Sequence, residues 1–427
     1  MKVNEISIEN FKGIDSLKFQ PRLLNVIVGR NNTGKTSILE AMALVLNSDF
    51  IEKNYSETPS AIINYLVDSC KITVSLFNNI KKEISVKIEK MSAQEIVDGM
   101  TAAILENIED LQSELNDHYF RRVKNVSSSL KALKNFVDMD ISEFPELVQE
   151  TVEEKMSSDV IGKLSQECII LRRGDGESFF FGEEFRHLQD DITLEVIEKA
   201  IGKHSDLERR ILRTSFIRFN SSLVSRIEDN NSSAITKYNE VTLVKDPLRY
   251  LRGILEKDKG KQELALEIEK ILKKEKIVPN LLRFDFTEIV FETPNGIKSV
   301  SFNRMGEGFQ ALVAILTLLK SINNSKTIFL IEEPEVHMHP GYVIELVKYL
   351  AQVSASLNVQ IFITSHSYDL IQSLLDESYP EQLKLFLKEN LLLLRLTRSE
   401  DTVIGENISY DEAKSDISDL QLDLRGV

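Results

Sequence analysis

The stretch of the chain that decides its fold reads Gly29-Arg30-Asn31-Asn32-Thr33-Gly34-Lys35-Thr36. It matches the pattern G-x-x-x-x-G-K-[ST] at every required position. The apolar run at residues 23–28 precedes it and is typical of a buried strand, and residues 37–44 follow with helical spacing. A strand, a glycine-rich loop and a helix in this order form a cradle for phosphates, because loop N–H groups and the positive end of the helix face the same point.

The residue types in this loop predict roles in binding a nucleotide. We expect Lys35 to reach the β- and γ-phosphates and the Thr36 hydroxyl to hold Mg²⁺. The other expected nucleotide-binding positions are Gly29, Asn31, Asn32, Thr33, Gly34 and Ser37. A chance match in a glycine loop is the alternative, and the flanking strand and helix argue against it.

The composition indicates a globular chain without membrane segments. At 427 residues it is long enough for two or three core-forming units. No apolar run reaches the roughly 20 residues that span a bilayer, and the first residues alternate like a strand rather than a signal peptide. Cys70 and Cys168 lie far apart, so we expect no disulfide framework. A cytoplasmic location with no membrane partner follows as an expectation.

The formal charge of −15 disfavours a protein that coats nucleic acid over its whole surface. A local basic groove remains open, because net charge says nothing about distribution. Arginines that could line such a groove are Arg121, Arg122, Arg172, Arg173, Arg209, Arg210, Arg213 and Arg218. We favour their alternative role on solvated helix faces.

Three segments are expected: 1–90 with the glycine loop, 91–280 mainly helical, and 281–427. In the first segment, Lys2 to Ile8 alternates like an edge strand. Further strands are expected at 16–19, 71–77 and 83–88. In the middle, we expect helices at 100–115, 136–156, 194–213 and 264–273, and a hairpin formed by 168–171 and 178–181.

The last segment predicts a parallel sheet. Residues 326–331 and 359–364 are nearly all apolar, which is typical of strands covered on both faces. We also expect a hairpin of 284–292 and 298–302, helices at 306–319 and 343–355, and a late strand at 391–396. The predicted fold class is therefore α/β.

Two carboxylates, Glu332 and Glu333, follow the first of these apolar strands. Ligands bind beyond the carboxyl ends of strands in open α/β sheets. We expect Glu332 to reach Mg²⁺ and Glu333 to orient and deprotonate an attacking water. The alternative is a pair of solvated acids, which the glycine loop upstream makes less attractive.

His366 follows the second apolar strand and can approach the γ-phosphate there. The alternatives are a structural or capping histidine. A zinc site of Glu335, His337, His339 and His366 is also possible, but a phosphate and Mg²⁺ site already explains the neighbourhood.

Gly306, Glu307 and Gly308 stand at an expected helix start, where free N–H groups suit an anion. Because the chain already has one phosphate loop, we expect this helix start to meet the nucleotide bound by a second copy. A plain connection between hairpin and helix is the alternative.

These motifs, in this order, resemble the ATP-binding-cassette (ABC) ATPases of the SMC, RecF and OLD group. Residues 29–36 look like their Walker A motif, 328–333 like Walker B, and 306–308 like the signature. Residues 335–340 stand in place of the D-loop, and His366 in place of the switch histidine. The resemblance implies an ABC-type ATPase head of two lobes with a helical insertion, and ATP and Mg²⁺ as cofactors. It also implies that Lys35, Glu333 and His366 are the catalytic residues. The chain would then pair head-to-head with a second copy or form a higher oligomer.

Residues 8–13, the G-E-G at 306–308 and the run E-E-P-E-x-H-x-H-P at 332–340 look most like OLD-family ATPases. That group includes ATPase subunits of anti-phage systems, such as the AriA subunit of PARIS, and Gabija. Sustained heptads and a C-x-x-C hook are missing, and the tail after His366 is too short for a Toprim domain. The only D-x-D, at 138–140, lies in the helical middle.

The resemblance thus implies a separate effector, such as a Toprim nuclease, in anti-phage defence. Two other functions remain open. One is a DNA-repair or maintenance ATPase that acts on DNA, as in RecF. The other is an ATP-bound scaffold with little turnover.

Overall fold

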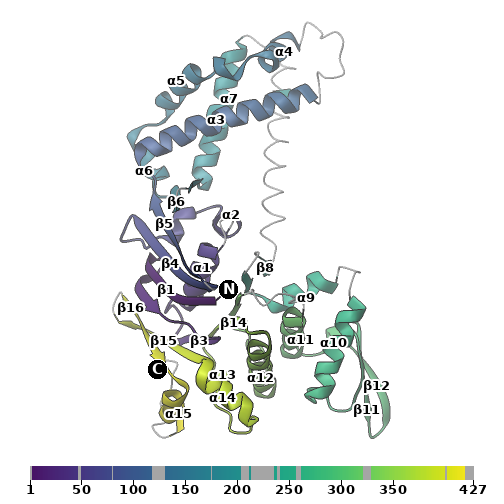
Figure 1. Ribbon diagram of the computed structural model, residues 1–427. Helices are drawn as coiled ribbons and strands as arrows, with labels where there is room; N and C mark the ends of the chain where they lie inside the picture. Colours follow the sequence, from purple (N-terminus) through teal and green to yellow (C-terminus); the bar gives the residue numbers. More distant parts are fainter. Residues whose placement is uncertain are drawn as a thin grey trace. The chain divides into compact units, whose positions relative to one another are not determined.

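The computed structural model describes residues 2–46, 50–78, 80–117, 130–174, 176–202, 211–212, 235–237, 241–255, 261–320, 328–399 and 402–418 (Figure 1). The chain divides into two compact units. One contains residues 1–48, 70–86 and 233–427, and the other contains 49–69 and 87–232. We call them the sheet unit and the helical unit. The three-segment division at residues 90 and 280 stays a prediction.

The sheet unit is built on a seven-stranded sheet with the order β16-β15-β3-β14-β13-β9-β8. Its five central strands run parallel, and the two outer strands are antiparallel to their neighbours. The strands are β3 (Leu24–Gly29), β8 (Ile235–Lys237), β9 (Val241–Val244), β13 (Ile328–Glu332), β14 (Gln360–Ser365), β15 (Leu391–Ser399) and β16 (Thr402–Ile408). The α/β fold and the parallel pairing of β13 with β14 are confirmed.

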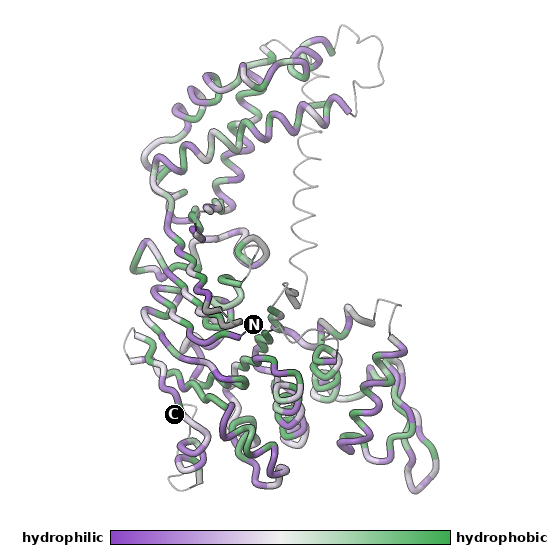
Figure 2. Tube along the Cα trace, in the orientation of Figure 1, coloured by the Kyte–Doolittle hydropathy of each residue, from purple (hydrophilic) through white to green (hydrophobic). Residues whose placement is uncertain are grey.

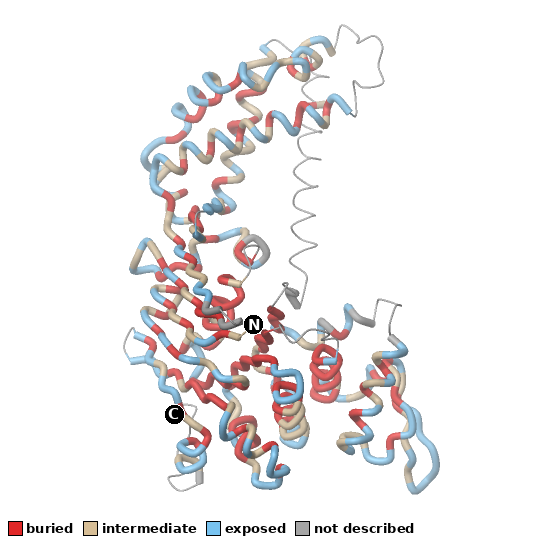
Figure 3. Tube along the Cα trace, in the orientation of Figure 1, coloured by how far each residue is buried: buried red, intermediate tan, exposed pale blue. Residues whose placement is uncertain are grey.

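Helices cover this sheet and carry most of its apolar core. Helix α11 is buried along nearly its whole length, which Figures 2 and 3 show as a largely hydrophobic and buried segment. Helix α1 packs against β3, β9, β13 and β14. The helices of this unit are α1 (Lys35–Leu46), α9 (Pro247–Leu255), α10 (Lys261–Lys274), α11 (Glu307–Lys320), α12 (Pro340–Leu357), α13 (Tyr368–Leu374), α14 (Glu381–Asn390) and α15 (Tyr410–Ser418).

The N-terminal strand β1 (Lys2–Phe11) lies between β2 (Ile14–Phe19) and β4 (Ser69–Asn78) and pairs antiparallel with both. The expected edge position of residues 2–8 is therefore wrong. Apolar and polar residues alternate along β1 because its side chains point to the two faces of the sheet in turn. The side of β1 that does not face β2 is paired with β4, which comes after α1 in the sequence. The next strand along the chain is β5 (Ile80–Lys90).

A small antiparallel sheet of β10 (Leu281–Phe284), β11 (Glu288–Thr293) and β12 (Gly296–Ser301) precedes a short 3₁₀ turn (Phe302–Arg304) and α11. The hairpin at Gly296 is confirmed. The strand expected over 284–292 is interrupted, because a turn held by Asp285 separates β10 from β11.

The helical unit contains an amphipathic helix, α3 (Ala93–Leu115), that begins with a capping box between Ser92 and Glu95. The helix expected over 136–156 is two helices, because Pro145 starts the second one and Asp140 caps a turn between them. The elements are α2 (Phe50–Asn54), a 3₁₀ turn (Pro59–Ile62), α4 (Lys131–Asp138), a 3₁₀ turn (Ile141–Glu143), α5 (Pro145–Lys155), α6 (Ser158–Leu164), β6 (Ile169–Arg173), β7 (Gly176–Phe180) and α7 (Glu183–Ile201).

The hairpin expected from 168–171 and 178–181 is confirmed, because β6 and β7 pair antiparallel. The helix expected over 194–213 starts earlier, at Glu183, and α7 ends before Gly202; residues 203–210 and 213 lie outside the described residues. Within the described ranges, no helix is both long enough and apolar enough to cross a membrane.

Both cysteine thiols are free and buried. Burial raises the pKa of Cys70 to about 12 and that of Cys168 to about 11. Since only the thiolate is a good nucleophile, both side chains behave as small core residues.

A buried ion cluster fixes α1 in the sheet unit. The Glu40 carboxylate accepts hydrogen bonds from Lys12, at the β1–β2 turn, and from Lys245, which follows β9. Lys245 Nζ lies 2.7 Å from Glu40 Oε1. Burial opposes ionisation of Glu40, but Lys245 and Lys12 together hold its pKa below the usual value. Three segments far apart in sequence are thus joined beneath the phosphate loop.

Candidate functional site

The glycine loop connects β3 to α1 by a backbone path that requires glycine. Gly34 has a φ of +89°, and a Cβ there would lie 3.0 Å from Ile14 Cγ1. The Ile38 N–H donates to the Gly34 carbonyl at 3.1 Å, so α1 begins directly after this turn. The free N–H groups of the first helical turn therefore face the space above the loop.

Lys35 is the first residue of α1, and its ammonium lies over the loop. Its Nζ donates to the carbonyls of Gly29 at 2.9 Å and Arg30 at 3.0 Å. Burial lowers the pKa of Lys35, and the nearby carboxylates of Glu333, Glu335 and Glu332 act in the opposite direction. The side chain thus stands where a phosphate between the loop and these acids would meet a cation.

The other loop positions differ in exposure. Asn31 and Asn32 are exposed, and Asn32 has a φ of +63°. Thr33 is buried, and its hydroxyl donates to the Arg30 carbonyl at 2.9 Å. Ser37 is half-buried in the first turn of α1. Their contacts to a nucleotide stay a prediction.

The two expected Mg²⁺ ligands contact each other. The Thr36 hydroxyl donates to Oε1 of Glu332, although the two residues are 296 positions apart. The contact forms because α1 starts beside the end of β13. A hydroxyl and a carboxylate at this point are oxygen ligands of the kind that Mg²⁺ prefers, so the residues present fit the ion.

Glu333 and His366 form the second pair at this edge. In the parallel register Glu332 lies opposite Thr364, so the residues that follow the two strands emerge side by side. His366 Nδ1 is 3.1 Å from Glu333 Oε1. Glu333 has a φ of +40°, and its N–H donates to the Thr364 carbonyl at 3.1 Å. A non-glycine residue in this conformation costs energy, which here aims the carboxylate at the histidine.

Gly308 lies against the turn that follows β13. A Cβ at Gly308 would lie 2.4 Å from the His337 carbonyl oxygen and 2.8 Å from Met338 Cα. Gly306 and Glu307, by contrast, are exposed. The helix start therefore packs on this turn through one glycine. Its expected contact with a second copy stays a prediction.

A cavity of about 390 Å³ lies beside Glu332 and Glu333. Glu307 and Lys245 line it as well, together with Asp246, Pro247, Leu248, Ala311, Pro334, Val336 and His337. Lys245 was not anticipated as part of the site. The sequence signal for it is the largely apolar run Val-Thr-Leu-Val at 241–244 immediately before it, which forms β9 next to β13.

A family model described as "AAA ATPase domain" matches residues 1–371. The chain belongs to this AAA ATPase domain family. Endonuclease GajA of Bacillus cereus (strain HuB5-5) is 20% identical over 374 residues, which are 82% of this chain and 52% of GajA. Uncharacterized protein MJECL11 of Methanocaldococcus jannaschii is 30% identical over 122 residues, which are 29% of this chain and 100% of that protein. The chain thus spans about half the length of GajA.

Two solved structures are similar at low identity. The SMC head domain from Thermotoga maritima has a TM-score of 0.44 and 10% identity, covering 96% of this chain and 100% of that one. An SmcHead bound to the C-winged helix domain of ScpA has a TM-score of 0.46 and 10% identity, covering 97% and 100%.

In this ATPase domain, the zinc alternative gains no support. His339 caps α12, since its Nδ1 accepts from the Gly341 N–H at 3.2 Å. Among the residues that the structure describes, no group of three His, Cys, Asp or Glu side chains is placed to hold a metal ion.

Of the arginines that could line a basic groove, Arg172 and Arg173 lie among the described residues. Arg172 forms ion pairs with three carboxylates of the helical unit, those of Glu89, Glu95 and Glu177. These pairs neutralise the charge that a phosphate would need. Arg173 is half-buried. The remaining arginines of the proposed groove lie outside the described residues.

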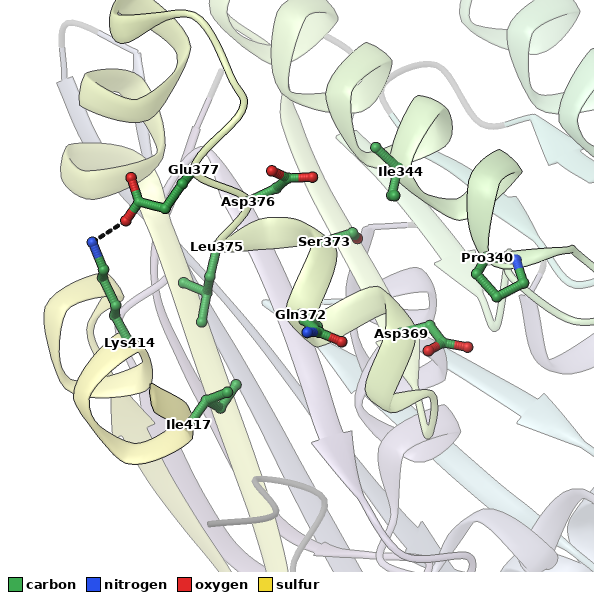
Figure 4. Close-up of a pocket in the computed structure, with 10 residues that line it drawn as sticks. All are labelled: Pro340, Ile344, Asp369, Gln372, Ser373, Leu375, Asp376, Glu377, Lys414 and Ile417. Carbon is green, nitrogen blue, oxygen red and sulfur yellow. Dashed lines mark hydrogen bonds and ion pairs between the residues drawn. The ribbon is translucent and has the colours of Figure 1, made fainter. Parts of the chain in front are cut away.

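A second cavity, of about 570 Å³, lies between α12, α13 and α15 (Figure 4). Leu375 and Ile417 line its apolar part, and Asp376 and the ion pair of Glu377 with Lys414 stand at its side. Pro340, the last residue of the segment in the D-loop position, lines it, but none of the predicted catalytic, nucleotide-binding, signature or Mg²⁺-binding residues does. It shares no lining residue with the cavity beside Glu332 and Glu333.

Proposed function

We propose that the chain binds ATP with Mg²⁺ and hydrolyses it as an ABC-type ATPase. The observation that carries the proposal is the contact between the Thr36 hydroxyl and the Glu332 carboxylate. It brings the phosphate loop and the acidic strand end together at one point, as an ATP site requires. Membership of the AAA ATPase domain family supports the same reaction.

In this proposal the residues divide the chemistry among them. Lys35 and the loop N–H groups bind the phosphates, and Thr36 with Glu332 holds Mg²⁺, which supplies charge neutralisation on the phosphate oxygens when bound. Glu333 orients the attacking water and accepts its proton. His366, held 3.1 Å from Glu333, fixes the direction of that carboxylate and faces the γ-phosphate. Positioning and electrostatics are sufficient for this reaction.

We further propose that two copies pair head-to-head, so that Gly306, Glu307 and Gly308 of one copy meet the nucleotide of the other. Pairing would gate an effector, for which a nuclease of the Toprim type is the proposed class, in anti-phage defence. The similarity to Endonuclease GajA supports a link to nuclease chemistry. Magnesium-dependent nuclease activity that co-elutes with the tagged chain from its host would support the link; a tagged chain that elutes without nuclease activity would contradict it.

Two substitutions test the ATP site. Lys35→Ala should weaken ATP binding at least about tenfold, because a buried cation is lost beside the phosphates. Glu333→Gln should bind ATP within about threefold of the wild type yet hydrolyse it about 10²- to 10⁴-fold more slowly. Equilibrium binding of a fluorescent ATP analogue and steady-state phosphate release measure the two effects.

The matched control is Glu292→Gln, at an exposed glutamate of β11, which should leave both quantities unchanged. Full hydrolysis by both site variants would remove the assignment. Tight ATP binding by a wild-type protein without turnover would favour the scaffold alternative instead.

A further inference from the structure

One buried carboxyl group in the sheet unit has no role in the chemistry above. Glu335 is 6% exposed and sits in the turn after β13. Its Oε1 accepts a hydrogen bond from the Ser365 hydroxyl, and its Oε2 has no hydrogen-bond partner among the described residues. Burying a carboxyl group in this way is costly, so an apolar residue would be the default at this position unless the group does something there.

Ser365 connects this carboxyl group to the histidine loop. It is fully buried at the end of β14 and lies opposite Val28 of β3. Its hydroxyl donates to Glu335 and accepts from the Ser367 N–H at 3.0 Å. The carboxylate thus orients the hydroxyl, and the hydroxyl holds the backbone on the far side of His366.

The position of His366 is therefore fixed from both sides. Ser365 precedes it in the sheet, and Ser367 follows it as the N-cap of α13, with its side chain accepting from the Leu370 N–H at 3.4 Å. The His366 side chain itself is half exposed, and within the described ranges its ring is paired with Glu333. Without these backbone restraints the ring could turn away from Glu333.

The other side of Glu335 leads to α11. Its carbonyl accepts from the Met338 N–H at 2.9 Å, which shapes the turn. Gly308 packs on the backbone of that same turn, at His337 and Met338. A continuous chain of contacts thus runs from the first turn of α11 through Glu335 and Ser365 to His366.

We propose that Glu335 is a positioning residue that acts through Ser365 to hold His366 against Glu333, and that it ties this histidine to the turn on which α11 begins. The proposal rests on the ATPase function proposed above. Under that function, the start of α11 meets the nucleotide of the partner copy, and His366 acts on the chain's own nucleotide. The buried side chains of Glu335 and Ser365 link these two parts of the molecule.

The kinetic test compares Ser365→Ala with Ser354→Ala. Ser354 is also fully buried, and its hydroxyl donates to the Val359 carbonyl at 2.9 Å at the far end of α12. Ser365→Ala should lower kcat about 10- to 100-fold, the effect expected from a small displacement of a catalytic group, with the ATP Kd changed less than about threefold. Ser354→Ala should leave kcat within about twofold.

Variants of Glu335 test the direction of the coupling. Glu335→Ala should lower kcat like Ser365→Ala, and the double variant should be no slower than the slower single variant, because both remove one linkage. Glu335→Gln keeps an acceptor for Ser365 and should recover part of the loss. Additive losses would contradict the linkage.

A spectroscopic readout separates this proposal from the function on which it rests. The Cε1–H signal of His366, assigned by its loss in His366→Gln, should move at fixed pH in Ser365→Ala and stay in place in Ser354→Ala. Wild-type kcat together with an unmoved signal in Ser365→Ala would overturn the proposal. If the wild type does not hydrolyse ATP, the proposed function fails and the His366 signal alone decides the positioning role.

Discussion

At Gly308 the backbone of α11 approaches the turn after β13 so closely that no side chain fits between them. The atoms that a Cβ would meet are the His337 carbonyl oxygen and Met338 Cα, both backbone. Backbone atoms cannot rotate away as a flexible side chain can. A Cβ added at Gly306, two residues earlier, would meet no atom within 4 Å.

The two glycines therefore make a matched pair. Gly308→Ala should lower the free energy of unfolding by about 1–3 kcal/mol, because α11 or the turn must shift. Gly306→Ala should cost less than about 1 kcal/mol, because a Cβ there meets open space. Urea denaturation of both variants measures the difference. Equal losses would show that the contact at Gly308 is not restrictive.

The placement of single residues was predictable where a motif fixes their spacing. The pattern and the apolar strand led us to expect Lys35, Thr36 and Glu332 at one site, and the structure brings all three together. Their roles stay predictions. The bond between Glu335 and Ser365 was not predictable, because it depends on how the turn after β13 folds back on the end of β14. Local sequence carries no signal for that approach.

Among the elements, the turn between β10 and β11 depends on one carboxylate. Oδ1 of Asp285 accepts from the N–H groups of Thr287 at 2.7 Å and Glu288 at 2.9 Å. Burial opposes ionisation of Asp285, but these bonds, the Thr287 hydroxyl and Arg283 lower its pKa to about 2. The turn ends β10 where the sequence predicted a continuous strand.

This lowered pKa predicts an acid-dependent loss of stability. The ionised Asp285 stabilises the folded state above its unfolded pKa near 4, and the contribution disappears as the pH falls through about 2. Asp285→Asn should therefore reduce the free energy of unfolding by about 2 kcal/mol at pH 7, and the difference from the wild type should shrink between pH 4 and pH 2. Denaturation across this range measures it; a difference independent of pH would contradict the assignment.

Strand β9 shows where element prediction fails. Val241–Val244 is four residues long and lies in a range expected to be mainly helical. Three apolar residues and one threonine fit a buried strand and a buried helical turn equally well. Only the pairing with β13 decides between them, and that partner lies far along the chain.

For the whole molecule, the proposed pairing of two copies predicts a change of mass. With ATP and Mg²⁺, the Glu333→Gln variant should have a sedimentation mass twice the 48.7 kDa of one chain. Bound ATP persists in this variant because hydrolysis is slow. Lys35→Ala should remain at the mass of one chain under the same conditions, since it does not retain the nucleotide. Analytical ultracentrifugation measures both. A mass that does not respond to ATP would contradict pairing through the nucleotide.

The general layout of the fold was predictable because the buried strands are long apolar runs next to recognisable helices. The order of those strands was not, since it depends on pairing between distant segments. Strand β3, for example, lies between β14 and β15, which both come from the last part of the chain.

This strand order has a consequence for synthesis on the ribosome. The Asn25 side chain donates to the Ile361 carbonyl, which is made 336 residues later. The ion pair of Glu40 with Lys245 likewise cannot form until Lys245 has been made. At roughly 5–20 residues per second, the glycine loop and β3 emerge on the order of half a minute before the strands that flank them. During translation β3 therefore stays an unpaired apolar strand, which makes it a natural client for chaperones until β14 and β15 have been made.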